Sequence, residues 1–188
     1  ATQLDAAASQ PHEMALKEYW VDLRKPKPTA KDLRRLVELD AQLVKNPQDA
    51  KALAARSFVL NDAPAQYRLA LRDAEAALEI ERSRGSAHLE RIYALTQLSE
   101  NTRAAEALAV MERAKVSRAD LALAYGYLAV AELEAYRYEA ALAYATQSIE
   151  AEPSAKRYQT RATILQRLGR DAQAQEDLQK AKSLKKKT

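Results

Sequence analysis

Residues 122–153, which read ALAYGYLAVAELEAYRYEAALAYATQSIEAEP, decide the fold of this chain. Two amphipathic helices are predicted within this stretch, because its larger side chains recur every three or four residues along each half. The first stripe contains Tyr125 and Leu128, and the second contains Tyr138 and Ile149. Alanines lie between them, and such small side chains let two helices pack near the short end of the usual spacing of about 8–10 Å. The stretch is therefore predicted to fold as a helical hairpin.

The same pattern recurs along the chain. Its copies start near residues 50, 87, 122 and 155, and are predicted to span 50–82, 87–115, 122–153 and 155–185. The last two copies are the clearest, whereas each of the first two has one extra residue between its helices. A further amphipathic helix is predicted over residues 31–45, where Thr29 and Asp32 resemble a capping box. The sequence thus predicts an array of repeated hairpins that follows one helical segment.

These repeats resemble the tetratricopeptide repeat, in which an aromatic residue, a leucine and a small residue precede small residues and a closing proline. Residues 122–153 depart from the family at Glu132 and Ala145, where aromatic residues are usual. The resemblance implies an all-α fold in which hairpins stack in sequence as a right-handed superhelix. The residues that match the family pattern are Tyr125, Leu128, Ala129, Tyr138, Ala141, Ser148 and Pro153.

The composition fits this fold class. The chain has 188 residues, of which 47% are hydrophobic, and this suits one domain or one short array with a continuous core. Its 3 glycines, its single Phe and the lack of alternating segments disfavour a sheet. No apolar run approaches the roughly 18 residues of a transmembrane helix, and the absence of Cys excludes disulfides and thiolate metal sites. The compartment stays open between the cytoplasm and a bacterial periplasm, and the alanine- and arginine-rich repeats favour a bacterial source.

The first 28 residues are predicted to lie outside the repeats. Residues 1–10 are small and polar, as in a frayed arm or in what remains after a signal peptide is cleaved. A helix is predicted over residues 11–23, and a basic linker with Pro26 and Pro28 follows it. The helix contains Trp20, which either caps the first face of the array or is an exposed anchor for a partner.

No catalytic, metal or cofactor site is predicted. His12 and His88 have no second histidine at the spacing of a metal site, and both are expected at the surface. The carboxylates are dispersed among lysines and arginines, as on solvated helix faces, and no glycine-rich phosphate loop or serine elbow is present. The sequence therefore favours a protein that is not an enzyme.

The positive charge is concentrated at the C-terminus. The net charge is +4, and five lysines lie within residues 180–188, so the rest of the chain is close to neutral. A broad nucleic-acid-binding face is therefore not expected. The tail at 186–188 either ends the last helix as a solvated run that suits the helix dipole, or contacts an anionic surface.

The resemblance also implies a binding surface, because in tetratricopeptide arrays the first helices of successive hairpins line a concave groove that usually holds a peptide of another protein. Tyr127 is expected at its centre, because it lies two residues after the core residue Tyr125 and points away from the core. The alternative is that Tyr127 and its neighbours pack against the array itself. Carried over by register, the groove positions are Ala54, Phe58, Asn61, His88, Arg91, Ile92, Leu95, Leu123, Tyr127, Val130, Glu134, Lys156, Gln159, Thr163 and Arg167.

Two functions remain open at this stage. The leading hypothesis is a non-catalytic scaffold or adaptor that binds a peptide segment or partner protein through the groove, within a larger assembly. Some relatives clamp the terminal carboxylate of chaperones with lysines and asparagines, but Ala54 and Phe58 occupy the first two of those positions, so that role is not expected. The alternative is a structural module that self-associates to form a homo-oligomer.

Overall fold

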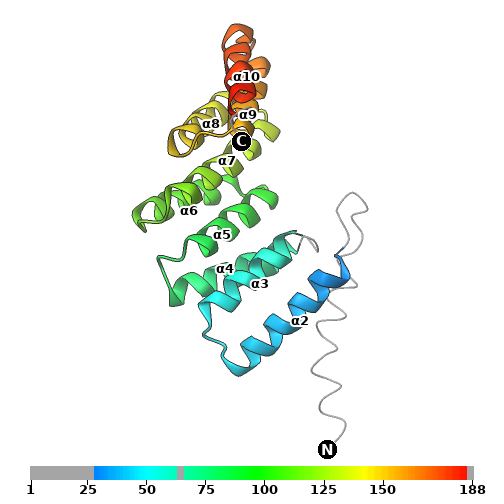
Figure 1. Ribbon diagram of the computed structural model, residues 1–188. Coiled ribbons are helices and arrows are strands. Elements are labelled where there is room, and N and C mark those ends of the chain that lie inside the picture. The colour runs from blue at the N-terminus through cyan, green and yellow to red at the C-terminus, as the bar shows by residue number, and fades with distance from the viewer. Residues whose placement is uncertain (1–27, 63–65, 186–188) are drawn as a thin grey trace, which may run out of the picture.

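The computed structural model describes residues 28–62 and 66–185, and every regular element in these ranges is a helix. The all-α prediction is confirmed. The predicted helix 11–23 with Trp20, and the predicted tail 186–188, lie outside the described residues. The helices in Figure 1 are α2 (Ala30–Lys45), α3 (Ala50–Asp62), α4 (Tyr67–Ile80), α5 (Gly85–Gln97), α6 (Asn101–Arg113), α7 (Arg118–Glu134), α8 (Tyr138–Ala151), α9 (Ala155–Arg167) and α10 (Asp171–Lys185).

The helices pair into hairpins that stack in chain order. The pairs are α3 with α4, α5 with α6, α7 with α8, and α9 with α10, and each hairpin also contacts the next one. Among the described helices α2 contacts only α3, and no contact joins it to α10. The helices α2 and α10 lie at opposite ends of the array (Figure 1). The contacts therefore join neighbouring helices and not the two ends of the described array, as expected for hairpins that stack in sequence.

The stack is curved with the first helices of the hairpins on its inner side. The successive first helices α3, α5, α7 and α9 contact one another in turn. The successive second helices α4, α6, α8 and α10 make no such contacts with one another. Because the helices on the inner side of a curved stack are the closer ones, the first helices form the concave surface of this solenoid.

Short polar side chains fix where several helices begin. Thr29 caps α2 as predicted, because Asp32 N donates to Thr29 Oγ1 at 3.2 Å and Thr29 N donates to Asp32 Oδ2 at 2.8 Å. Ser117 Oγ accepts from Asp120 N at 3.1 Å, so α7 begins at Arg118, earlier than the predicted start at 122. The repeat pattern predicts the first buried residue of a helix, whereas the capping residue determines where the helix begins.

Three hairpins share one turn geometry. Ser99, Tyr136 and Gly169 have φ angles of 61°, 60° and 71°, which lie in the left-handed region. The backbone N–H of the residue after each one donates to a carbonyl five residues earlier, at 2.9 Å in all three turns. Gly169 is the one glycine among these three turn residues, whereas Gly85 and Asn101, which also tolerate left-handed backbone, are the first residues of α5 and α6.

The core consists largely of alanine and leucine. Ala129 of α7, Ala141 of α8 and Ile164 of α9 are all fully buried and form one cluster, so the alanines lie where helices cross, as predicted. A larger cluster joins the hairpins from α3 to α7 and includes Ile92, Leu95 and Leu128. The buried apolar residues form four clusters along the stack, and the partly buried Val59, Tyr144 and Leu142 each pack against two of them. Each hairpin thus buries its apolar face against its neighbours.

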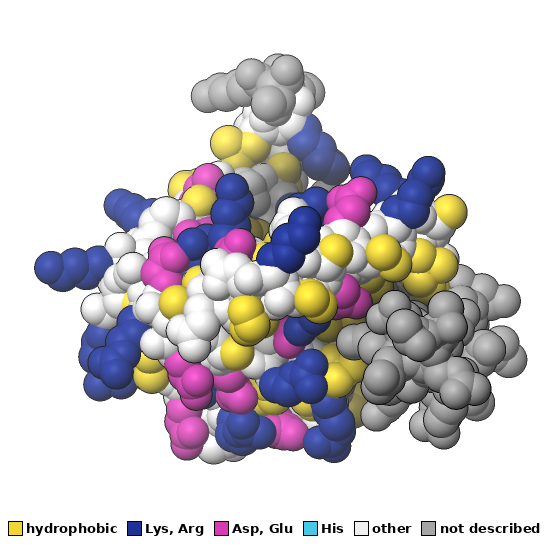
Figure 2. Space-filling model, turned by 90° about the horizontal axis from the view of Figure 1, so that it is seen from below, with side chains coloured by type: hydrophobic (Ala, Val, Ile, Leu, Met, Phe, Trp, Pro, Cys, Tyr) yellow, Lys and Arg dark blue, Asp and Glu magenta, His cyan; other side chains and the backbone are white. Residues whose placement is uncertain are grey.

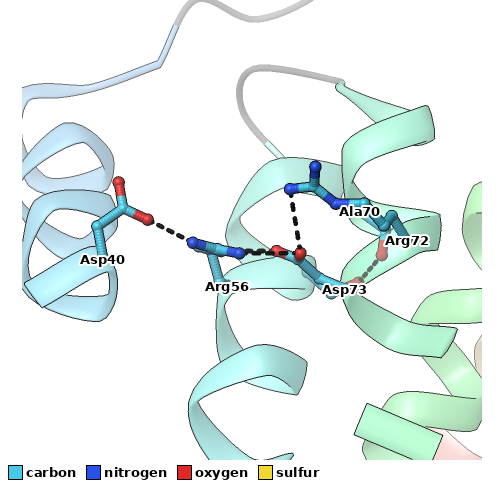
Figure 3. Close-up of polar contacts among 6 residues, drawn as sticks. Asp40, Arg56, Ala70, Arg72 and Asp73 are labelled. Atoms are coloured by element: carbon cyan, nitrogen blue, oxygen red, sulfur yellow. Dashed lines mark hydrogen bonds and ion pairs between the residues drawn. The ribbon is translucent and has the colours of Figure 1, made fainter. Parts of the chain in front are cut away.

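Charged pairs hold the hairpins at both ends of the array. Arg56 of α3 lies between Asp40 of α2, at 2.6 Å, and the buried Asp73 of α4, at 2.6 Å and 2.9 Å (Figure 3). In the last hairpin Arg161 donates to the buried Asp177 at 2.7 Å and 2.8 Å. Both arginines occupy the same repeat position, where the central repeats have Tyr93 and Leu128. The end repeats therefore use an ion pair where the central repeats use apolar packing.

Candidate protein-binding surface

The concave side of the solenoid carries exposed apolar side chains. Phe58 of α3 is 57% exposed, and Leu123 and Val130 of α7 are 43% and 42% exposed. Leu123, Tyr127, Val130 and Glu134 follow one another at spacings of four, three and four, so they lie along one face of α7, which we call the α7 stripe. Three of the predicted groove residues on this helix, Leu123, Val130 and Glu134, are exposed.

Tyr127 is half-buried and packs against the array itself. Its ring lies 5.0 Å from that of Tyr93 on α5, which lies 6.3 Å from the ring of Tyr67 on α4. Burial raises the pKa of Tyr127, and the nearby Glu90 carboxylate adds to the rise. The expectation that Tyr127 points well away from the core is wrong, and the alternative, in which it packs on neighbouring repeats, describes the ring better.

Three other predicted groove residues, His88, Ile92 and Leu95, belong to the core of the central repeat. Ile92 and Leu95 are fully buried, in the same cluster as Leu60 of α3 and Leu128 of α7. His88 is only 2% exposed, so its expected surface position is also wrong. Its Nε2 atom lies 2.8 Å from the Arg82 carbonyl oxygen, and burial lowers its pKa. These side chains are covered because α5 has a first helix on each side, α3 and α7, both in contact with it.

The remaining predicted positions divide between surface and interior. Arg91 is half-buried, with its Nε atom 3.5 Å from Glu75 Oε1 on α4. Thr163 of α9 is exposed, and its Oγ1 donates to the Gln159 carbonyl of the preceding turn at 3.1 Å. Of the other positions, those that are buried are Ala54 and Asn61, and those that are exposed are Lys156, Gln159 and Arg167.

A groove of about 920 Å³ lies between α2, α3 and α5. Phe58 lies in its wall, so the groove continues the concave surface toward the first end of the array. Figure 2 views this end of the molecule and shows hydrophobic patches that are separated by lysines, arginines, aspartates and glutamates. The residues that line the groove are Lys31, Asp32, Arg34, Arg35, Glu38, Lys51, Ala54, Ala55, Phe58, Val59, Asp62, Arg84, Ser86 and Glu90.

Two acidic side chains of this groove already form interactions within α2. Asp32 accepts the cap hydrogen bonds of α2, and Glu38 Oε2 lies 3.1 Å from Arg35 Nη1. Within residues 28–62 and 66–185, Lys31 and Lys51 take part in no ion pair. Among the described residues, the groove therefore combines the exposed ring of Phe58 with two lysines that form no ion pair.

Glu90 is an acidic group that was not predicted as part of the site. It lies on α5 in the groove wall and accepts a hydrogen bond from Asn61 Nδ2 at 2.8 Å. Burial raises the pKa of Glu90 to about 7, and Asp62 adds to the rise. The sequence contained a signal, because the other repeats have Leu53, Tyr125 and Tyr158 at this position. A carboxylate in a core position of one repeat marks a site that differs from ordinary packing.

The part of the chain that the structure describes holds no cluster of His, Cys, Asp or Glu side chains that could bind a metal ion. None of the helices α2 to α10 is both long enough and apolar enough to span a membrane.

The fold is shared with solved structures, whereas no family model and no curated protein matches the sequence. MamA 41-end from Desulfovibrio magneticus RS-1 has a TM-score of 0.67 and 17% identity, over 85% of this chain and 88% of that one. A double mutant of MamA RS-1 has a TM-score of 0.65 and 19% identity, over 81% and 84%. TTC0263, a thermophilic TPR protein of Thermus thermophilus, has a TM-score of 0.65 and 17% identity, over 79% and 80%. At these identities the likeness is one of fold, and the chain folds as a solenoid of the tetratricopeptide-repeat type.

Proposed function

We propose that this chain is a non-catalytic scaffold or adaptor that binds a peptide segment or a partner protein on its concave surface. The observation that carries the proposal is the exposed apolar surface of the first helices, formed by Phe58 on α3 and by Leu123 and Val130 on α7. Apolar side chains that are clustered on one concave side, with polar residues around them, are typical of a protein interface.

The exposure of these residues indicates that they serve an interface with another molecule and not the core of the array. Phe58, Leu123 and Val130 keep about half of their surface in water although they lie on helices whose opposite faces are well buried. The α7 stripe is open because α7 makes only sparse contact with α9, whereas it packs closely against α5. An extended or helical segment could lie along α7 and reach Phe58 past the rings of Tyr127 and Tyr93. Glu134 and Thr163 would border its path.

The experiment compares a double variant of the α7 stripe with a control variant at a similarly exposed valine on another helix. The double variant Leu123→Ser/Val130→Ser removes the apolar part of the α7 stripe. The control Val110→Ser changes a side chain of α6 that is 43% exposed, almost as Val130 is, but lies on a second helix. All three proteins are used for crosslinked affinity purification and for thermal melting by circular dichroism. We expect unchanged melting in both variants, and loss of the captured partner in the double variant alone. Equal capture by the wild type and the double variant would exclude the stripe as the binding surface.

The second candidate function, self-association, is favoured by exposed apolar side chains away from the concave surface. Val37 and Val44 of α2 are 69% and 84% exposed. Light scattering over a range of protein concentrations separates the two functions, because a self-associating module increases in mass with concentration. A constant monomer mass would support an adaptor for a different protein.

A further inference from the structure

The groove between α2, α3 and α5 carries positive charge that the described chain does not balance. Lys31 of α2 and Lys51 of α3 line this groove and are exposed. Within the described residues neither lysine takes part in an ion pair. Arg34 of α2 is also exposed in the groove wall, and its Nε atom donates to the Ala30 carbonyl at 3.2 Å.

Three of the four acidic side chains in the groove wall are occupied elsewhere. Asp32 accepts the cap hydrogen bonds of α2, and Glu38 pairs with Arg35 at 3.1 Å. Glu90 accepts a hydrogen bond from Asn61 Nδ2, and burial raises the pKa of Glu90 to about 7. At neutral pH Glu90 therefore carries only part of a negative charge. These three groups do little to offset the exposed cations.

The cations lie at the two ends of the groove, with Phe58 between them. The bond of 2.6 Å between Asp40 and Arg56 fixes the height of α2 against α3, and the two helices are antiparallel because a short connection joins them. At a rise of 1.5 Å per residue, Lys31 lies about 13 Å from this bond toward the C-terminal end of α3. Lys51 lies about 7 Å from it in the opposite direction, so Phe58 is about 10 Å from each lysine along the helix axes.

The fourth acidic side chain of the groove, Asp62, is offset by Arg34. The same helical rise places Asp62 of α3 and Arg34 of α2 at one height, about 9 Å from the bond of Arg56. Both are exposed and line the groove. The groove is therefore left with one lysine at each end and with the ring of Phe58, which is 57% exposed, near its middle.

We propose that this groove binds an extended acidic segment of the partner protein, in which an apolar side chain contacts Phe58 and flanking carboxylates contact Lys31 and Lys51. The inference rests on the proposed function and adds the chemistry of the partner. An extended chain advances about 3.3 Å per residue, so the distance of about 10 Å corresponds to three residues. The expected segment thus has an acidic residue, two further residues, an apolar residue, two further residues and a second acidic residue.

An extended segment suits the groove better than a helix does. A helix needs about 14 residues to cover the span of about 20 Å between the two lysines, whereas an extended chain needs about six. The groove has a volume of about 920 Å³, which is at the upper end of what pockets for small ligands have. The shorter occupant therefore fits.

The spacing of the charges favours an acidic peptide over a nucleic acid. A single strand carries a phosphate at each nucleotide, so a groove that binds it has cations along its whole length. In this groove the two lysines are far apart, and the carboxylates of Glu38 and Asp62 line the wall between them. Phosphates in the middle of the groove would meet these carboxylates, whereas carboxylates spaced as in the expected segment would not.

The proposal is tested by titrating the isotope-labelled full-length chain with synthetic peptides and following its amide signals by NMR, which detects weak binding. The probe is a blocked peptide with a glutamate at each end, a leucine in the middle and two serines in each gap. We expect the largest shifts in the amides of α2, α3 and α5 that line the groove. A probe with glutamines in place of the glutamates should bind several-fold more weakly. This comparison uses the wild-type chain alone.

A charge exchange makes the test specific to the two lysines. The variant Lys31→Glu/Lys51→Glu should bind the glutamate probe about tenfold more weakly or worse, because two attractive pairs become repulsive. It should instead prefer a probe with lysines at both ends. The control Lys182→Glu/Lys185→Glu has the same net charge but changes two exposed lysines of the distant helix α10, and should bind the glutamate probe as the wild type does. Circular dichroism verifies that both variants are folded.

The alternatives give different results. Equal binding of the glutamate and glutamine probes overturns the proposal, and so does the lack of amide shifts in the groove or an unchanged affinity in the variant Lys31→Glu/Lys51→Glu. Single-stranded DNA that displaces the glutamate probe at a lower concentration than the free peptide does shows a nucleic acid as the occupant and also overturns it. Partner capture separates this inference from the proposed function. If Leu123→Ser/Val130→Ser loses the partner while Lys31→Glu/Lys51→Glu keeps it, the concave surface binds a protein but the acidic segment is wrong.

Discussion

At the scale of the residue, Arg56 is the side chain on which the first described hairpin depends most. It binds Asp73, which is only 2% exposed, and also Asp40 of the preceding helix. We expect Asp73→Ala to lower the free energy of unfolding by about 3 kcal/mol, because it leaves the partly buried guanidinium without its main partner. Urea unfolding measures this loss.

Two further variants make the expectation specific to the buried pair. Glu38→Ala breaks the exposed Arg35–Glu38 pair of α2 and should cost less than about 1 kcal/mol. Replacement of both partners, Arg56→Met/Asp73→Leu, should restore much of the stability, because no unpaired charge is then left in the hairpin. A loss in Asp73→Ala as small as that in Glu38→Ala would contradict the role assigned to this pair.

Glu90 should make the stability depend on pH. Its pKa rises from 4.5 to about 7 on folding, mainly through burial. The unfolded chain thus releases this proton near pH 4.5 while the folded chain keeps it to about pH 7. Stability should therefore fall as the pH rises through this window, by up to about 3 kcal/mol, and then level off.

The variant Glu90→Gln tests this pH dependence. Glutamine cannot ionise, but its side-chain oxygen can still accept from Asn61 Nδ2. We expect this variant to be more stable than the wild type at pH 8 and to show a flatter profile between pH 4.5 and 7. The exposed Glu79→Gln on α4 is the control and should keep the wild-type profile. Identical profiles of wild type and Glu90→Gln would show that Glu90 does not titrate in this window.

Single residues also show which feature could not be predicted from the sequence, namely the burial of individual groove positions. The register of the repeats identified the first helices and their inward positions, but not which of these positions are covered. Ile92 of α5 and Val130 of α7 are both apolar groove positions, yet Ile92 is fully buried and Val130 is 42% exposed. The difference arises because α5 contacts a first helix on each side, whereas α7 makes only sparse contact with α9. Such packing depends on side chains far apart in the chain. Hydrophobic periodicity contains no such information.

At the scale of the element, helices were predicted well and their ends less well. Stripes of apolar residues indicate helices because the helical period is a local property. Turns are harder, because the left-handed residue of a hairpin is expected to be glycine, and only Gly169 is. Ser99 and Tyr136 adopt the same geometry, held by the hydrogen bonds that close the turn. The packing of the two helices thus overrides the preference of the turn residue.

This strain gives a prediction for the turns. We expect Ser99→Gly to stabilise the protein by about 1 kcal/mol, because glycine adopts a positive φ without steric cost. Gly169→Ala should destabilise it by a similar amount, since alanine would have to take up a φ of 71°. No heavy atom lies within 4 Å of a Cβ placed at Gly169, so the loss would come from the backbone alone. Thermal melting of both variants measures the two effects, and changes of the same sign would contradict this explanation.

At the scale of the whole molecule, the order of the repeats follows directly from the sequence. A repeat of about 35 residues cannot bury its own apolar face, so each copy packs on the next one and the stack continues. The predicted hairpins at 50–82, 87–115, 122–153 and 155–185 correspond to the observed pairs from α3–α4 to α9–α10. The curvature of the stack could not be predicted in the same way, because it depends on the angle between neighbouring hairpins. The exposure of the groove residues depends on the same angle and could not be predicted either.

A stack with contacts only between neighbours should also unfold from its ends. The helices α5 and α7 have a hairpin on each side, whereas α10 contacts α9 alone among the described helices. We therefore expect amide hydrogen exchange to show the highest protection in α5 and α7 and lower protection in α10. Exchange measured by mass spectrometry on peptides from each helix gives this gradient directly.

Two matched substitutions test whether the hairpins respond locally. Ala174 of α10 and Ala70 of α4 are both fully buried, and a change to glycine costs each helix about 1 kcal/mol in propensity. Because coupling decays along a stack of neighbours, Ala174→Gly should speed exchange in α9 and α10 and leave α3 and α4 unchanged. Ala70→Gly should speed exchange in α3 and α4 and leave α10 unchanged. Uniform acceleration in every helix by either variant would mean that the array unfolds as one unit, and that contacts between neighbours are strong enough to make its ends as stable as its centre.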